Sequence, residues 1–283
     1  MNKNLLNELY SKAFRSGNPL YLFIGINILV FLIIGLIAVA EFLFKTNTSV
    51  ASWLVRQLSM PANLEILAYK PWTIITYMFL QREVFHVLFN LLWLYWMGMI
   101  FMDFLNKRQF IFTYVAGGIA GALLYLLAYN TLPAFSDLSQ KSFLLGCSAS
   151  VMAIVIGTAT LVPDYTIRLL LFGAVRLKYL AIAYFALDII GMGGGNPGGS
   201  IAHIGGAILG FVFIKQLNNG SDLSKILKKR SKLKVVPNKS KTRTETIQTD
   251  QDTIDNILDK ISKSGYESLS KNEKDALFKA SKK

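Results

Sequence analysis

The chain contains only two histidines, His86 and His203, and both lie within long apolar runs. Asn90 follows His86 by four positions, so the two side chains share one face of a helix. Ser148 lies near the start of a third apolar run. A serine hydroxyl becomes nucleophilic beside a base such as histidine, and amide or imidazole donors stabilise an oxyanion. These residue types therefore indicate hydrolytic chemistry.

The depth of these polar groups in their helices supports that interpretation. Counting at about 1.5 Å per residue to the far end of each apolar run puts Ser148 roughly 22 Å, His203 roughly 18 Å, Asn90 roughly 20 Å and His86 roughly 26 Å from that end. A hydrocarbon core is about 30 Å thick. All four groups are thus expected in one layer, and ionisable residues inside a membrane span are functional by default.

Small residues accompany the serine and the second histidine. Gly206 and Gly210 follow His203 in its run, and Ala149 begins a series of small residues at a spacing of four after Ser148. Small faces allow two membrane helices to approach closely. We therefore expect the helices that carry Ser148 and His203 to pack against each other.

The amino-acid composition indicates which kind of fold positions these side chains. Of 283 residues, 53% are hydrophobic and 17% are charged, and there is one cysteine. A soluble domain averages about 25% charged residues, so a water-soluble enzyme, a disordered chain and a disulfide scaffold are all excluded. The expected fold class is all-α: a polytopic membrane protein with a six-helix bundle and a small helical soluble tail.

Six apolar runs are long enough to be read as spans. They cover Leu20–Phe44, Val84–Met102, Phe110–Asn130, Cys147–Val162, Leu177–Met192 and Ile201–Leu217. Ala38-Val39-Ala40 resembles a signal-peptidase site, but the apolar stretch before it exceeds 7–15 residues, which favours an uncleaved helix. The six glycines in Gly191–Ser200 predict a mobile, non-helical loop.

Basic residues in alternate loops predict that both termini face the cytoplasm, in a multi-pass protein of the plasma or inner membrane. We expect a cytoplasmic segment over 1–19, a membrane domain over 20–217, a polybasic linker over 218–249 and a helical tail over 250–283. Nine basic residues and no acidic ones lie within 225–243, which favours contact with anionic lipid over nucleic acid. In the tail, Ser270 and Glu273 form the capping-box pattern of a short second helix, although a partly ordered tail is an equal alternative.

Three motifs resemble those of the rhomboid intramembrane serine proteases. They are His86-x-x-x-Asn90, Gly146-Cys147-Ser148-Ala149, and Ala202-His203-x-Gly205-Gly206-x-x-x-Gly210. The resemblance implies a six-helix bundle in which Ser148 is the nucleophile and His203 its general base, acting as a dyad. It also implies an oxyanion hole made by His86, Asn90 and the Ser148 backbone N–H. Transmembrane proteins are the implied substrates, and no third carboxylate, cofactor or metal is implied.

The sequence departs from the family pattern at several positions. Ala149 stands where glycine is usual, and Met152 stands where an aromatic residue usually stacks on the histidine, which leaves the orientation of His203 without an explanation. Thr73 replaces an arginine that commonly follows Trp72. Asp188 lies near the outer end of its span, where a snorkelling or hydrogen-bonded carboxylate is the expected reading.

Other interpretations of the same residues remain open. Cys147 and Ser150 are alternative nucleophiles, but they lie about 100° and 200° around the helix from Ser148 and so face elsewhere. A catalytically silent rhomboid-fold protein that binds transmembrane helices is the main rival to a protease. A transporter is less favoured, because no inverted repeat is evident.

Overall fold

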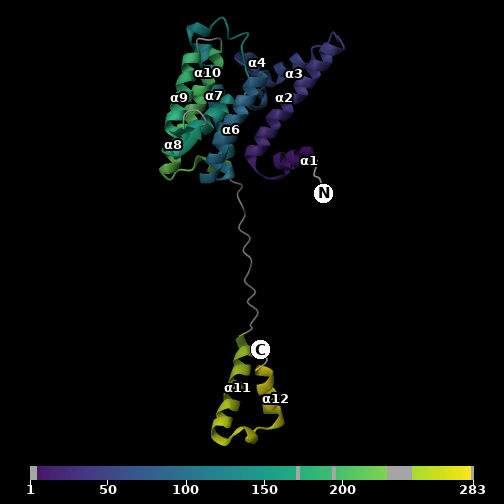
Figure 1. Ribbon diagram of the computed structural model, residues 1–283, viewed down its shortest axis with the longest axis vertical. Coiled ribbons are helices and arrows are strands. Elements are labelled where there is room, and N and C mark those ends of the chain that lie inside the picture. The colour runs from purple at the N-terminus through teal and green to yellow at the C-terminus, as the bar shows by residue number, and fades with distance from the viewer. Residues whose placement is uncertain (1–4, 170–172, 193–195, 228–243, 282–283) are drawn as a thin grey trace. The chain divides into compact units, whose positions relative to one another are not determined.

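A computed structural model describes residues 5–169, 173–192, 196–227 and 244–281. The chain divides into two compact units, residues 1–229 and 230–283 (Figure 1). Most of the predicted polybasic run, residues 228–243, lies outside the described residues.

The first unit is a helical bundle with two small pairs of strands. Its longer helices are α2 (Pro19–Leu43), α3 (Val50–Leu58), α6 (Val84–Phe104), α7 (Lys107–Thr131), α8 (Ser148–Leu161), α9 (Leu177–Gly191) and α10 (Pro197–Asn218). Its shorter helical segments are α1 (Leu5–Tyr10), η1 (Ser11–Arg15), α4 (Leu64–Tyr69), α5 (Thr73–Thr76), η2 (Tyr77–Phe79), η3 (Pro133–Phe135) and η5 (Leu223–Leu227). The expected all-α membrane fold is confirmed.

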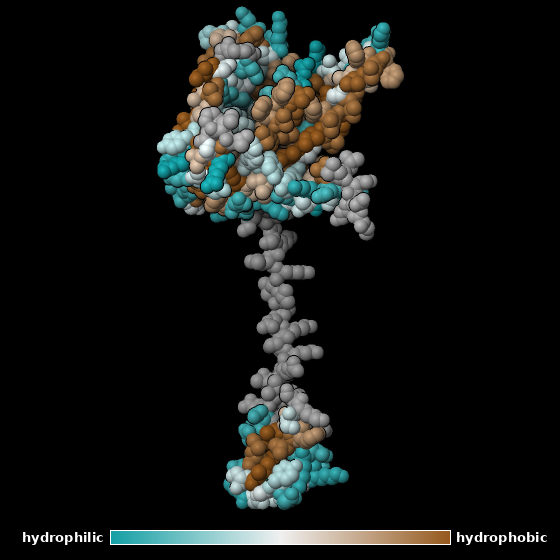
Figure 2. Space-filling model, in the orientation of Figure 1, coloured by the Kyte–Doolittle hydropathy of each residue, from teal (hydrophilic) through white to brown (hydrophobic). Residues whose placement is uncertain are grey.

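Each of the six predicted apolar runs forms a helix. Four of these helices, α2, α6, α7 and α10, are long and apolar enough to cross a membrane, whereas α8 and α9 are apolar but have only 14 and 15 residues. Large apolar side chains such as Leu36 and Phe89 are exposed along α2 and α6. Figure 2 shows the resulting hydrophobic surface on this unit. Such a surface is stable in lipid and not in water.

Glycines let α7, α8 and α10 pack almost backbone to backbone. A Cβ atom on Gly206 would overlap the carbonyl oxygen of Ala149, and one on Gly210 would overlap that of Ala153. On α7, a Cβ on Gly121 would lie 2.6 Å from the Ala202 carbonyl oxygen. This close contact fixes α10 against α8 in parallel register and leaves no room for side chains between them.

A short strand pair ties the long segment before α6 to the start of α8. Strand β1 (Met60–Pro61) pairs antiparallel with β2 (Phe143–Leu144). Two residues after β2, the Gly146 N–H donates to the Tyr77 carbonyl oxygen, and Gly146 adopts a φ of 116°. Residues with a Cβ rarely adopt this conformation. Gly146 thus turns the chain into α8.

The loop between α8 and α9 forms the second strand pair, β3 (Thr166–Leu169) with β4 (Gly173–Arg176). Asp164 accepts hydrogen bonds from Lys178 at 2.8 Å and Arg176 at 3.3 Å. The Lys178 hydrogen bond and positive charge lower the pKa of Asp164 below its usual value. Arg176 and Lys178 therefore share one acidic partner.

The expectation that residues 191–200 form a non-helical loop is wrong for Gly191, which ends α9, and for the last four residues. Helix α10 begins at Pro197, with the Asn196 side chain accepting a hydrogen bond from the Gly199 N–H at 3.0 Å. Proline suits the first helical position and asparagine the cap. A Cβ on Gly198 would lie 2.9 Å from Tyr125 and Tyr129, so glycine also serves packing here. Residues 193–195 lie outside the described residues.

The folded part of the first unit also continues past the predicted domain end at 217. Asp222 accepts a hydrogen bond from Arg108 of α7 at 2.6 Å, and buried Ser224 accepts one from the same guanidinium at 3.0 Å. These contacts fasten η5 to the start of α7. Residues 218–227, predicted as the start of a linker, therefore pack on the bundle.

The second unit is a helical hairpin. Helix α11 (Thr244–Ser264) ends at Gly265, which has a φ of 77°, and η6 (Tyr266–Ser268) leads to α12 (Lys271–Ala280). The predicted capping box between Ser270 and Glu273 is present. Hydrogen bonds from Lys260 and from the Ser270 N–H lower the pKa of Glu273 to about 2. Ile257 and Leu269 are buried in this hairpin.

Candidate active site

Ser148 is the first residue of α8 and is 8% exposed. The first N–H groups of a helix have no intrahelical partner, and in this turn the Val151 N–H is the one that bonds back to the Cys147 carbonyl oxygen. The N–H groups of Ser148 and Ala149 come before it in the helix and therefore point out of the N-terminal end of α8. A negative charge that develops there meets free backbone donors and the positive end of the helix dipole.

His203 lies on α10, one helical turn before Gly206. Because Gly206 contacts Ala149, the next residue after Ser148, the close approach of the two helices brings the serine and the histidine to the same level of the bundle. The Nε2 atom of His203 is buried and has no hydrogen-bond partner among the described residues. Catalytic hydrogen bonds are commonly long before a substrate binds.

Of the two roles expected for Asp188, the structure shows the hydrogen-bonded one, and the partner is His203. The Oδ1 atom of Asp188 lies 2.6 Å from Nδ1 of His203, and the two side chains are 15% and 13% exposed. The expectation that no third carboxylate accompanies the serine and histidine does not hold in this geometry. A carboxylate that faces an imidazole inside the bundle is hydrogen-bonded and does not snorkel toward the membrane surface.

His86 and Asn90 reach the same region from α6. An atom placed as the Cβ of Gly146 would lie 3.6 Å from Nε2 of His86 and 3.7 Å from Oγ of Ser148. Asn90 is buried, and its Nδ2 lies 3.5 Å from Oε1 of Gln81. The predicted residues of α6 and α8 thus converge on the space beside Gly146.

Gln81 and Asn27 belong to this region and were missed by the sequence analysis. Gln81 is 1% exposed; its Nε2 donates to Asn27 Oδ1 at 3.2 Å and lies 3.0 Å from Sγ of Cys147. Asn27, fully buried in α2, donates in turn to Tyr114. A lone asparagine in an apolar span was an available signal, whereas Gln81 lies in an irregular segment without periodicity.

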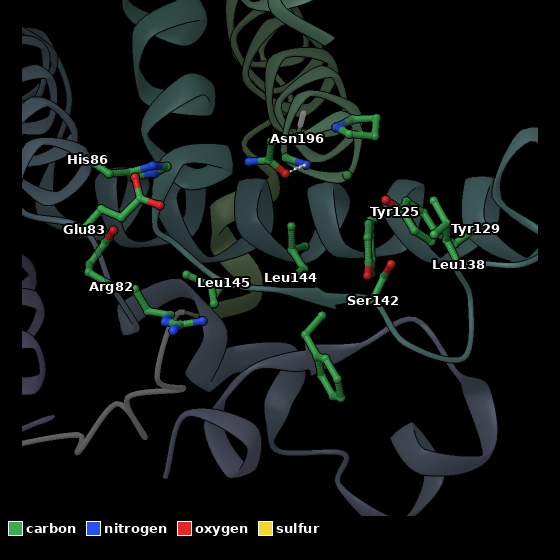
Figure 3. A pocket seen from close by; sticks show the side chains of 15 residues that line it. Arg82, Glu83, His86, Tyr125, Tyr129, Leu138, Ser142, Leu144, Leu145 and Asn196 are labelled. Atoms are coloured by element: carbon green, nitrogen blue, oxygen red, sulfur yellow. Dashed lines mark hydrogen bonds between the residues drawn. The ribbon is translucent and has the colours of Figure 1, made fainter. Parts of the chain in front are cut away.

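A cavity of about 640 Å³ opens beside Gln81 and His86, and its described lining does not include Ser148 or His203. Figure 3 shows His86 and Glu83 at one end and Tyr125 and Tyr129 at the other, with Asn196 between them. The edge strand β2 forms one wall through Phe143 and Leu144. A cavity with a strand edge on one side can accept an extended peptide segment by main-chain hydrogen bonds.

The arrangement can support nucleophilic chemistry at Ser148, with an imidazole and several neutral donors around it. Within the part of the chain that the structure describes, no group of three or more His, Cys, Asp or Glu side chains is placed to hold a metal ion. The fold and this region together define a membrane-embedded helical bundle with a polar interior site.

The chain belongs to the rhomboid family. Residues 68–218 match the model of the Rhomboid domain, which covers more than half of the chain. A curated relative, RHOMBOID-like protein 12, mitochondrial, of Arabidopsis thaliana, is 28% identical over 158 residues, which is 52% of this chain and 47% of that protein. The match thus spans about half the length of each. Residues 244–283 match a family of unknown function (DUF6576).

Proposed function

We propose that this chain is an intramembrane serine endopeptidase that hydrolyses peptide bonds in or near transmembrane segments of membrane proteins. The observation that carries the proposal is the contact of α8 with α10 at Ala149 and Gly206, next to Ser148 and one turn from His203. Membership of the rhomboid family supports it. No cofactor is required for this chemistry.

In the proposed reaction, the Ser148 hydroxyl oxygen attacks the carbonyl carbon of the scissile bond while its proton passes to Nε2 of His203. The carbonyl oxygen becomes an oxyanion. The carbon–nitrogen bond then breaks, and His203 returns the proton to the leaving amine. Water attacks the resulting ester in the same way, which releases the new carboxyl terminus and restores the serine.

The oxyanion is stabilised in this proposal by the Ser148 N–H and by donors on His86 and Asn90. Replacing Asn90 with alanine is expected to lower turnover by about 10–10³-fold, because one donor to the developing charge is lost. Labelling by a fluorophosphonate probe should persist, since the nucleophile and base remain. Turnover would be measured with a model transmembrane substrate in detergent. If this variant kept the wild-type turnover, Asn90 would not be part of the oxyanion hole.

The proposed topology has six spans with both termini in the cytoplasm, in the plasma or inner membrane. The polar site then lies toward the outer face, where a substrate helix meets water. The basic residues of 225–243 contact anionic lipid headgroups on the cytoplasmic side, at about 1 kcal/mol per residue near the surface. The catalytic domain comprises the predicted 20–217 together with the packed segment 218–227.

The function is tested by treating the purified full chain with a fluorophosphonate probe and mapping the labelled peptide by mass spectrometry. We expect the adduct on Ser148 and cleavage of a model transmembrane substrate in the same preparation. A folded protein that takes up no probe and cuts no substrate would favour the alternative of a catalytically silent protein that binds transmembrane helices.

The helical hairpin 244–283 is expected to be dispensable for the chemistry, because every proposed catalytic group precedes it. A chain that ends at Leu227 keeps the Arg108–Asp222 ion pair and should cleave the model substrate at a rate close to that of the full chain. A chain that ends at Asn219 lacks Asp222 and Ser224 and should unfold at a lower temperature. Loss of activity in a folded chain ending at Leu227 would contradict this prediction.

A further inference from the structure

The contact between Asp188 and His203 joins α9 to α10 inside the bundle. Asp188 Oδ1 and His203 Nδ1 are 2.6 Å apart, slightly shorter than the roughly 2.7–2.9 Å usual for a charge-assisted hydrogen bond between nitrogen and a carboxylate oxygen. Both side chains are largely buried. An ionisable residue at such a depth is costly unless it is paired, and its partner marks its role. Here the partner is the imidazole that the proposed function uses as a base.

The orientation of α9 is fixed by an aromatic contact one turn before the aspartate. Tyr184 stacks on Trp93 of α6, with ring centroids 4.7 Å apart and planes inclined by 20°. Ile182 and Ile190, on the opposite side of the helix, are 64% and 76% exposed. The face that carries Tyr184 and Asp188 therefore points into the bundle, and the aspartate is directed at α10.

A second residue of α10 holds the same aspartate. The Ser200 hydroxyl donates to the Asp188 backbone carbonyl at 3.2 Å and lies 3.5 Å from its Oδ1. Ser200 and His203 are three residues apart and share one face of α10. Oδ2 of Asp188 has no hydrogen-bond partner within the described ranges. The two α10 side chains thus both engage Oδ1 of the carboxylate.

We propose that Asp188 is a positioning residue for His203, so that the chain works with a Ser148–His203–Asp188 triad instead of a dyad. The proposal rests on the proposed function. Beside an ionised carboxylate, Nδ1 of His203 must carry a proton, which leaves the lone pair on Nε2 free for the serine. When the Ser148 proton reaches Nε2, the imidazolium forms next to Asp188, which stays ionised throughout.

A contact with Asp188 would also explain how His203 is oriented although Met152 stands where an aromatic residue is usual. The family pattern commonly has an aromatic residue there to stack on the histidine, and its absence leaves the ring without that support. A hydrogen bond from Nδ1 to Asp188 sets both the tautomer and the ring plane, as outer partners do for other functional histidines. The carboxylate therefore replaces a packing contact with an electrostatic one.

The first test reads the tautomer directly and needs no catalysis. The full-length Ser148→Ala protein, labelled with nitrogen-15 histidine, contains only two imidazoles, and a His86→Gln variant assigns them. At a pH at which both rings are neutral, we expect His203 to be protonated at Nδ1 and bare at Nε2. Adding Asp188→Asn should produce a mixture of tautomers, because the amide can donate or accept. A His203 ring protonated at Nε2 beside Asp188, or a tautomer that Asp188→Asn does not change, would overturn the proposal.

The second test compares kinetics in otherwise wild-type protein. In soluble triad enzymes the same carboxylate-to-amide change lowers kcat about 10⁴-fold, so Asp188→Asn and Asp188→Ala are expected to lower kcat by about 10²–10⁴-fold with little change in KM. The matched control is Asp137→Asn, which neutralises an exposed carboxylate and should leave both constants unchanged. If Asp188→Asn kept the wild-type kcat while Ser148→Ala was inactive, the triad would be rejected but the proposed protease activity would not. If the wild-type chain had no activity, the proposed function would be rejected. The nitrogen-15 measurement of the His203 tautomer would still test whether Asp188 holds the imidazole.

Discussion

Replacing Ser148 with alanine is expected to abolish both substrate cleavage and fluorophosphonate labelling. Removal of the nucleophile from a soluble serine protease costs on the order of 10⁶ in kcat, which is below detection in a gel-based assay. Ser148 is the residue whose neighbour, Ala149, touches the histidine helix at Gly206. Alanine has a higher helix propensity than serine, so the variant should remain folded and monodisperse.

Two neighbouring residues provide matched controls. Ser150 is 1% exposed, two residues farther along α8, and its hydroxyl lies toward Gly118 of α7. Cys147 contacts Gln81 through its sulfur. Ser150→Ala and Cys147→Ala should both keep most of the activity, and thiol reagents should inhibit only weakly. Activity retained in Ser148→Ala, or lost in Cys147→Ala alone, would identify a different nucleophile.

The helices of the bundle could be predicted closely from the sequence. The expected ends of the six apolar runs differ from the observed helix ends by four residues or fewer, because hydropathy and chain breakers act locally. The largest difference is at the start of α10, where Asn196 and Pro197 begin a helix inside a glycine-rich stretch. Capping there outweighs the entropic cost of glycine.

The candidate site could be predicted only in part. His86 and Asn90 are four residues apart on one apolar helix, and Ser148 and His203 each precede small residues on two others, a pattern that the sequence displays. The pairing of Asp188 with His203 depends instead on how α9 is rotated about its axis, and a helix that is apolar on most sides carries no periodic signal of that rotation. The contact of Tyr184 with Trp93, which sets the rotation, joins residues far apart in the sequence.

Replacing Gly206 with alanine is expected to impair both stability and activity. The added Cβ would overlap the carbonyl oxygen of Ala149, and a backbone atom cannot rotate away as the end of a side chain can. Overpacking of this kind typically costs about 1–3 kcal/mol. The helices must separate to relieve it, so Ser148 moves away from His203 and turnover falls with the melting temperature.

The matched control is Gly35→Ala in α2. A Cβ at Gly35 meets no atom within 4 Å, so this change adds only the helix preference of alanine over glycine, up to about 1 kcal/mol. It should leave turnover unchanged and should not lower the melting temperature. Thermal unfolding and substrate cleavage, measured for both variants in the same detergent, check the prediction. If Gly206→Ala behaved like Gly35→Ala, the backbone contact between α8 and α10 would not be what holds the serine and histidine helices in register.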